Sequence, residues 1–157
     1  MSGKGKMRKS VEIIILDSEA EYRQEYIDVF VKGESYSLRK IPVVFDEKSF
    51  DHIFFEAEDD TNKKGKFSIR RAKKMHFIRA MLHEKVDIEI MYEQDRGTIA
   101  IFCVALDCIM YLRNRVGTGK LQIGSFFDVG KDHTKMLERR RKQCVLLSDE
   151  KLRELIK

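Results

Sequence analysis

Three residues of this chain carry side chains that could move protons while a phosphodiester bond is broken. Cleavage of RNA without a metal needs a base that takes the 2′-hydroxyl proton and an acid that protonates the leaving 5′-oxygen. Glu89 or His52 could be the base, and His52 or His133 could be the acid. An imidazole suits either role because its charge changes near neutral pH. These residue types point to acid–base chemistry on RNA.

Four further residues could hold the phosphate and stabilise the phosphorane that forms during cleavage. Arg71 and Arg113 could each donate two hydrogen bonds to phosphate oxygens, and Tyr111 and Ser125 could act as neutral donors. With the base and acid above, these side chains supply every role that metal-independent cleavage requires.

Simpler roles remain open for the same residues. Glu89 and Arg113 could form an ordinary ion pair on an exposed sheet. Tyr111 could pack against Phe102, and His52 could be a half-buried histidine beside an apolar segment. Composition alone does not choose between these roles and catalysis.

Other kinds of site fit the sequence poorly. It contains no HExxH, no Cys/His cluster at zinc spacing, no GxxxxGK[ST] and no GxGxxG. The carboxylates of residues 56–60 could hold a divalent ion, but they have the composition of a flexible acidic loop. His76 and His83 lie in a predicted helix, where structural roles are the better interpretation. We therefore expect neither a metal nor a cofactor.

Basic residues gather in two blocks, and this suggests a polyanionic partner. The chain has 31 Lys and Arg against 26 Asp and Glu, a formal net charge of +5, and the blocks span residues 63–74 and 131–142. Two solvated helix faces would give the same pattern. The candidate contacts to nucleic acid are Lys73, Lys74, Arg115, Lys135, Arg139 and Arg140.

Length and composition favour one globular domain. A chain of 157 residues with 43% hydrophobic residues and one proline fits a single core over residues 10–157, after a flexible basic tail at residues 1–9. Three cysteines without a CxxC pair fit a reducing compartment, and the apolar run at residues 11–16 is too short for a signal peptide or membrane span. The sequence thus predicts a cytoplasmic protein that does not enter a membrane.

The clearest secondary structure is a helix over residues 69–82, capped by Ser68, followed by four strands. Apolar residues recur at helical spacing in the helix and alternate with polar residues in the first strand. Ser18 and Glu21 form a capping box for a helix that ends near Gly33. Further expected elements are a strand at residues 11–16, an extended segment at residues 41–45, and helices at residues 131–143 and 148–157.

The hairpins that join the four strands decide which side chains share a face. We expect Glu93 opposite Thr98, Ala105 opposite Cys108, and Val116 opposite Lys120. One face is then apolar and can receive the 69–82 helix, while the other stays open. The open face carries, across the strands, Glu89, Phe102, Tyr111 and Ser125, with Arg113 and Arg115 nearby. The predicted fold is α+β, a four-stranded antiparallel meander with helices packed on one face.

Three segments of the sequence resemble a known group of proteins. They are Phe50-Asp51-His52-Ile53-Phe54-Phe55, the stretch Phe67–Ile78 with its Arg71-Ala72 pair, and the end of the fourth strand at Gly124-Ser125-Phe126. The pattern is similar to the phage-associated nuclease-like domains of the barnase–EndoU–colicin–RelE superfamily and covers about residues 50–130. The proline that often follows the Ser/Thr-aromatic pair is replaced here by Phe127.

The resemblance implies an α+β fold with a helix on one sheet face and an RNA-cleaving site on the other. It implies roles for His52, Arg71 and Ser125, with Arg113 in the usual basic strand position. The leading hypothesis is a metal-independent endoribonuclease, of the kind that phages or mobile elements carry as a toxin and that an antitoxin or immunity protein neutralises. The alternatives are a non-catalytic nucleic-acid-binding module on the same fold and a domain that binds acidic protein surfaces.

Overall fold

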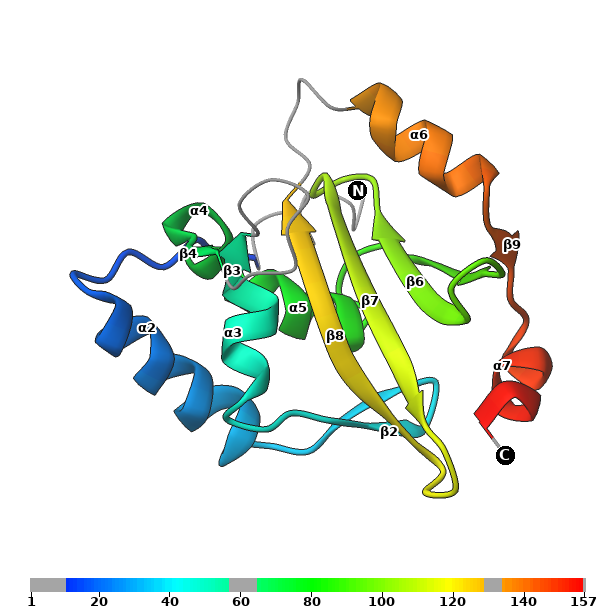
Figure 1. Ribbon diagram of the computed structural model, residues 1–157, viewed down its shortest axis with the longest axis horizontal. Coiled ribbons are helices and arrows are strands. Elements are labelled where there is room, and N and C mark those ends of the chain that lie inside the picture. The colour runs from blue at the N-terminus through cyan, green and yellow to red at the C-terminus, as the bar shows by residue number, and fades with distance from the viewer. Residues whose placement is uncertain (1–10, 57–64, 129–133, 157) are drawn as a thin grey trace, which may run out of the picture.

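One curled, seven-stranded sheet organises the molecule. The computed structural model describes residues 11–56, 65–128 and 134–156, so the predicted tail at residues 1–9 lies outside the described residues. The strand order is β1-β2-β8-β7-β6-β5-β9, and the sheet bends into a half-barrel (Figure 1). The strands are β1 (Tyr36–Leu38), β2 (Ile41–Val44), β5 (Glu89–Glu93), β6 (Thr98–Cys103), β7 (Cys108–Arg115), β8 (Lys120–Asp128) and β9 (Val145–Leu146). A separate two-stranded sheet pairs β3 (Phe55–Glu56) with β4 (Lys66–Phe67).

The predicted architecture was wrong, although the α+β class holds. The sheet is not a four-stranded antiparallel meander, because β1, β2 and β9 join it and β2 runs parallel to β8. The four central strands do pair antiparallel with their sequence neighbours. The three added strands are two to four residues long, and segments this short carry too little alternation to be recognised.

A β-bulge in β8 determines which of its side chains enter the core. Leu112 pairs with Ile123 and Tyr111 with Ser125, so Gly124 is the extra residue. The bulge lets Ile123 and Phe126, three residues apart, both point into the core, where they are 2% and 0% exposed. The hairpin beside it pairs Arg115 with Lys120, one residue away from the expected register.

The other hairpins fit the expectation in different degrees. Glu93 pairs with Thr98 as predicted, whereas Cys103 rather than Ala105 pairs with Cys108. A shift of two residues keeps every side chain on its predicted face but changes its neighbours. Glu89 therefore lies in one row with Phe102, Ile109 and Phe127, away from Tyr111 and Ser125.

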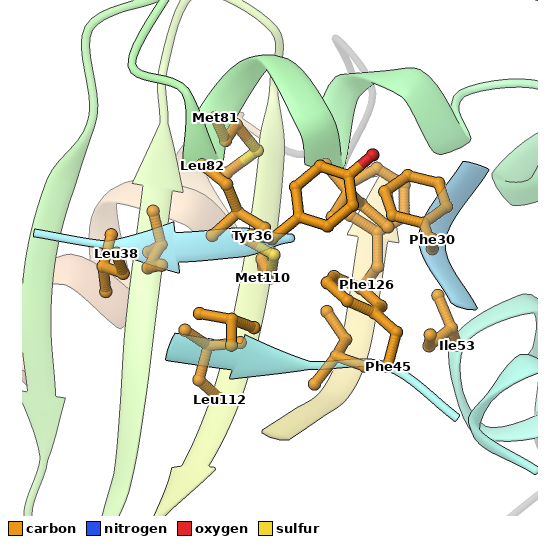
Figure 2. Packing of buried hydrophobic residues seen from close by; sticks show 14 of the residues in the cluster. Phe30, Tyr36, Leu38, Phe45, Ile53, Met81, Leu82, Met110, Leu112 and Phe126 are labelled. Atoms are coloured by element: carbon orange, nitrogen blue, oxygen red, sulfur yellow. The ribbon is translucent and has the colours of Figure 1, made fainter. Parts of the chain in front are cut away.

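Helices cover the core face of the sheet, which carries Ile90, Ile101, Met110 and Leu112. The expected 69–82 helix is divided into α4 (Ile69–Ala72) and α5 (Met75–Leu82), and Met81 and Leu82 of α5 contribute to the core (Figure 2). The helix α2 (Glu19–Tyr26) begins at Ser18, whose Oγ accepts from the Glu21 amide, and continues into the π-helical turn η1 (Ile27–Val31). The helix α3 (Ser49–Phe54) lies along β8.

Two other expectations about the fold were wrong. Residues 11–16 form no strand, and Ile14 instead donates a backbone hydrogen bond to Lys73 at the end of α4. The opposite face of the sheet, called here the second face, is not open. It holds its own apolar cluster of Met91, Ala100, Phe102, Ile109 and Tyr111.

The C-terminal elements contact both faces of the sheet, because residues 140–144 reach the second cluster while Leu152 and Ile156 are buried in the main core. The helix α6 (Thr134–Lys142) leads to edge strand β9 and then to α7 (Asp149–Ile156) (Figure 1). Arg140 and Arg141 of α6 donate hydrogen bonds to Tyr111 and Glu89 on the second face. Helices therefore contact both faces of the sheet rather than one. No helix among the described residues combines the length and apolar character needed to cross a membrane.

Candidate nucleic-acid interface

A pocket of about 530 Å³ opens beside the start of β6 and the end of β7. Strands β5 to β8 line it from the second face and, at Tyr92, Ile99 and Asn114, from the core face around the end of β6, and Leu155 of α7 borders it. Three residues of the predicted site line this pocket: Tyr111, Arg113 and Ser125. The remaining lining residues that carry polar or aromatic groups are Tyr92, Glu93, Arg96, Thr98, Asn114 and Phe127.

The bulge at Gly124 positions Arg113. A Cβ atom at Gly124 would lie 3.4 Å from Arg113 Nε and 3.4 Å from the Tyr111 carbonyl oxygen, so the arginine side chain crosses the bulge at close range. Without the extra residue, Ser125 would fall on the core face. The bulge thus brings the guanidinium and the hydroxyl to the same side of the sheet.

The guanidinium of Arg113 is available to a ligand. The residue is exposed and, among the described residues, has no hydrogen bond or ion pair with the protein. Most arginines nearby differ, because Arg140 and Arg141 bind Tyr111 and Glu89. An unpaired guanidinium beside hydroxyl donors can grip a phosphate oxygen pair.

A carboxylate that the sequence analysis did not single out lies in the same pocket. The side chain of Glu93 is 14% exposed, accepts a hydrogen bond of 3.0 Å from Thr98 Oγ1, and lies 3.8 Å from Arg96 Nε. The signal was present: Glu93 stands four residues after Glu89 in an alternating strand, so both must point to the same face. Glu93, not Glu89, is the acidic residue beside Arg113 and Tyr111.

Tyr111 and Phe127 form an aromatic wall of the pocket. Tyr111 is 6% exposed, and its hydroxyl accepts a 3.0 Å hydrogen bond from Arg140. Burial raises the pKa of Tyr111, with Arg140 opposing the shift, so the phenol stays protonated at neutral pH. The rings of Tyr111 and Phe127 meet edge to face at 5.8 Å.

Arg71 reaches the border of the pocket through Phe127. Its guanidinium carbon lies 4.6 Å from the centre of the Phe127 ring, and Nη1 donates to the Phe55 carbonyl. The side chain is 12% exposed, and burial lowers the pKa of Arg71. Arg71 therefore supports the aromatic wall and presents little free surface of its own.

The structure does not bring Glu89 or His52 into this pocket. Both carboxylate oxygens of Glu89 lie 2.7 Å from the Arg141 guanidinium, which makes the pair a clamp between β5 and α6. His52 is exposed on α3, which flanks β8 on the side away from β7 (Figure 1). His133 lies outside the described residues. His76 and His83 are each paired with a glutamate, Glu25 and Glu34.

Some of the predicted nucleic-acid contacts are exposed, and the others are half-buried or bound to protein groups. Arg115, Lys135 and Arg139 are exposed, whereas Arg140 is bound to Tyr111. Lys73 is half-buried, and Lys74 donates to Asp128 at 2.7 Å with 19% of its side chain exposed. The described part of the 63–74 block is therefore partly committed to holding α4 against β8, and the exposed charge lies around α6 and the end of β7.

Comparison of the chain with protein-family models, curated proteins and solved structures finds no match. Within the described ranges, no group of three His, Cys, Asp or Glu side chains is arranged to hold a metal ion. The pocket and its charges are therefore the features that bear on function.

Proposed function

We propose that this protein binds RNA in the cytoplasm and holds the RNA backbone at the second-face pocket. The observation that carries the proposal is the guanidinium of Arg113, which lies in a concave site with no protein partner among the described residues. Ser125 offers a hydroxyl group beside it. These groups suit a phosphodiester, because arginine binds two phosphate oxygens at once and hydroxyls add neutral donors.

The surroundings of the pocket favour a long polyanion over a small anion. The last turn of α6 consists of Arg139, Arg140, Arg141 and Lys142. Arg140 and Arg141 hydrogen-bond to the second face of the sheet, whereas Arg139 and Lys142 are exposed. Together with Arg115 at the end of β7, Arg139 and Lys142 would give a polyanion held at Arg113 further cations to contact. Binding of this kind weakens steeply as salt displaces the contacts.

The resemblance to nuclease-like domains agrees with the choice of RNA. Arg113 and Ser125, two residues to which the resemblance assigns roles, line the pocket. Arg71, a third, borders it through Phe127. His52, the fourth, is on α3 and does not line the pocket.

The test is equilibrium binding of a fluorescent RNA, measured by anisotropy in EDTA at several salt concentrations. Arg113→Met should weaken binding by about ten-fold, and the slope of log K against log salt should fall by about 0.7 to 1, because one phosphate contact is lost. Arg153→Met, which removes the same charge from an exposed position on α7, should change neither quantity. Equal behaviour of the two variants would exclude Arg113 as the phosphate ligand.

A second candidate function is cleavage of the bound RNA, and the position of Glu93 favours it. Its carboxylate shares the pocket with Arg113, a cation for the phosphorane, and with Tyr111, a protonated donor. In this scheme Glu93 takes the 2′-hydroxyl proton, the 2′-oxygen attacks the phosphorus, and the 5′-oxygen leaves with a proton from the solvent or an acid. A neutralising antitoxin-like partner would then have to cover this pocket.

Single-turnover cleavage of a long RNA in EDTA separates binding from catalysis. If the protein cleaves RNA here, Glu93→Gln should slow the reaction by about 10²- to 10⁴-fold, while His52→Ala should leave it nearly unchanged. The reverse result would transfer the acid–base role to α3. If the wild-type protein binds RNA but leaves it intact, the non-catalytic function stands.

A further inference from the structure

We infer that Glu89 competes with RNA for the guanidinium of Arg141, so that an RNA phosphate replaces this carboxylate when the complex forms. The inference rests on the proposed function and adds to it a phosphate contact that is occupied by the protein itself when RNA is absent. It is carried by the geometry of the Glu89–Arg141 pair, by its exposure and by the cations around it.

The pair has the geometry of an arginine bound to a phosphate. Arg141 Nε lies 2.7 Å from Glu89 Oε1, and Arg141 Nη2 donates to Glu89 Oε2 at 2.7 Å. Arginine also binds phosphate through two parallel bonds from one guanidinium to two oxygens of the same anion. Glu89 therefore occupies the edge of Arg141 that a phosphate would use.

The pair is accessible and can be exchanged at low cost. The side chain of Arg141 is 33% exposed and that of Glu89 is 34% exposed, so a ligand can reach both. Ion pairs with this exposure contribute little to stability. Among the described side chains, α6 hydrogen-bonds to the sheet through this pair and through the bond from Arg140 to Tyr111. Release of Arg141 thus breaks a contact of α6 and leaves the strand pairing of β5 in place.

The neighbouring charges favour an anion at this position. Arg140 is bound to the hydroxyl of Tyr111, which stays protonated, so the bond does not neutralise the arginine. Arg139 and Lys142 stand on either side in the sequence and are exposed. In the described part of the chain, Glu89 is the acidic side chain that hydrogen-bonds to this turn of four cations. A phosphate in its place would meet a row of cations, the arrangement that binds a polyanion.

The pair lies within reach of an RNA that is held at the pocket. Glu89 shares a row with Ile109, which precedes Arg113 by four residues on β7. Four residues along a strand and two strand spacings across the sheet put the backbones of Glu89 and Arg113 roughly 17 Å apart. Phosphates follow one another about every 3.4 Å along one strand of a duplex, so an RNA of a few nucleotides can contact both Arg113 and Arg141.

The test follows arginine side chains by nuclear magnetic resonance while a single-stranded RNA is added to the isotope-labelled full chain. The Nε–H signals of Arg113 and Arg141 should move together and saturate at the same RNA concentration. The signal of Arg153, which is exposed on α7, should stay in place. A moving Arg113 signal with a fixed Arg141 signal would overturn the inference and leave RNA binding intact. If no signal moves and no RNA binds, the proposed function itself fails.

Affinity gives a second readout in the anisotropy assay. Glu89→Gln removes the competing charge and should tighten RNA binding by about two- to five-fold, the range expected from loss of a part-exposed ion pair. Glu138→Gln is the matched control, because it removes the same charge from an exposed position on α6 one turn before Arg141, and it should change the affinity less. Thermal melting shows whether each variant is folded. Equal gains from the two substitutions, or weaker binding by a folded Glu89→Gln protein, would overturn the competition.

Discussion

The buried carboxylate of Asp128 gives a sharp test of how the structure uses its basic residues. Its side chain is 3% exposed at the end of β8, and it accepts hydrogen bonds from Lys74 Nζ at 2.7 Å and Arg70 Nε at 2.9 Å. Burial alone would raise the pKa of Asp128, but the hydrogen bonds from Lys74 and Arg70 outweigh it and hold the pKa below its usual value. Asp128→Asn removes the charge and preserves the shape.

The size of the effect follows from the exposure of the two partners. A hydrogen bond to a charged group contributes about 1.5–3 kcal/mol, whereas an exposed ion pair contributes about 0–1 kcal/mol. Lys74 is 19% exposed and Arg70 is 52% exposed, so most of the loss should come from Lys74. Since asparagine keeps one acceptor oxygen, the free energy of unfolding should fall by about 2 kcal/mol. The melting temperature should fall by about 4–8 °C for a chain of this size.

Urea unfolding at pH 7 and at a series of lower pH values measures this loss. A carboxyl whose folded pKa is lowered stabilises the protein above its unfolded pKa of about 4 and loses that contribution as the pH falls through the folded pKa. The wild-type and Asp128→Asn curves should therefore converge in acid. Glu84→Gln, which breaks a 2.8 Å pair with Arg39 that is exposed on both sides, is the control and should cost less than about 1 kcal/mol. A loss below about 0.5 kcal/mol for Asp128→Asn, or a gap that persists into acid, would refute the reasoning.

Two further predictions concern local structure. Ser68→Ala should lower the free energy of unfolding by about 1 kcal/mol in the same urea assay, because Ser68 Oγ accepts from the Arg71 amide at the start of α4; an unchanged midpoint would show that the cap contributes nothing. In the native protein, Cys144 should be the first cysteine to react with a thiol reagent, since burial raises the pKa of all three thiols but only Cys144 is partly exposed. Mass spectrometry of briefly labelled protein would contradict this if Cys103 or Cys108 were modified before Cys144.

The elements that follow a local pattern were predictable from the sequence. The capping box at Ser18 and the alternation in β5 determine a helix start and a strand face from neighbouring residues alone. The parallel contact of β2 with β8 is different, because Val43 and Leu121 meet only when the chain has folded. No periodicity in either segment indicates this partner, so the half-barrel could not be foreseen.

The apolar character of the second face is indicated by the sequence of β6. Residues 98–106 are almost continuously apolar, a pattern typical of a strand that is buried on both sides. The expectation of one open face required the opposite. Phe102, assigned to the open face, is 0% exposed in the second cluster.

Part of the candidate site was also predictable, for reasons that differ between residues. Tyr111 and Ser125 are direct partners as expected, but only because the bulge at Gly124 compensates for a hairpin register that was wrong by one residue. A glycine inside a strand is itself a bulge signal. His52 entered through the resemblance and not through strand register, and it is the residue that the structure leaves outside the pocket.

Photocrosslinking tests most directly whether RNA lies in the second-face pocket. A single-stranded RNA that contains 4-thiouridine is irradiated in complex with the full chain, and the modified peptides are identified by mass spectrometry. Crosslinks should fall on the peptides that carry Arg113 and Phe127, and Arg113→Met should reduce them while Arg153→Met does not. Crosslinks confined to residues 63–74 or to α3, with none from β7 or β8, would contradict the proposed location of RNA binding.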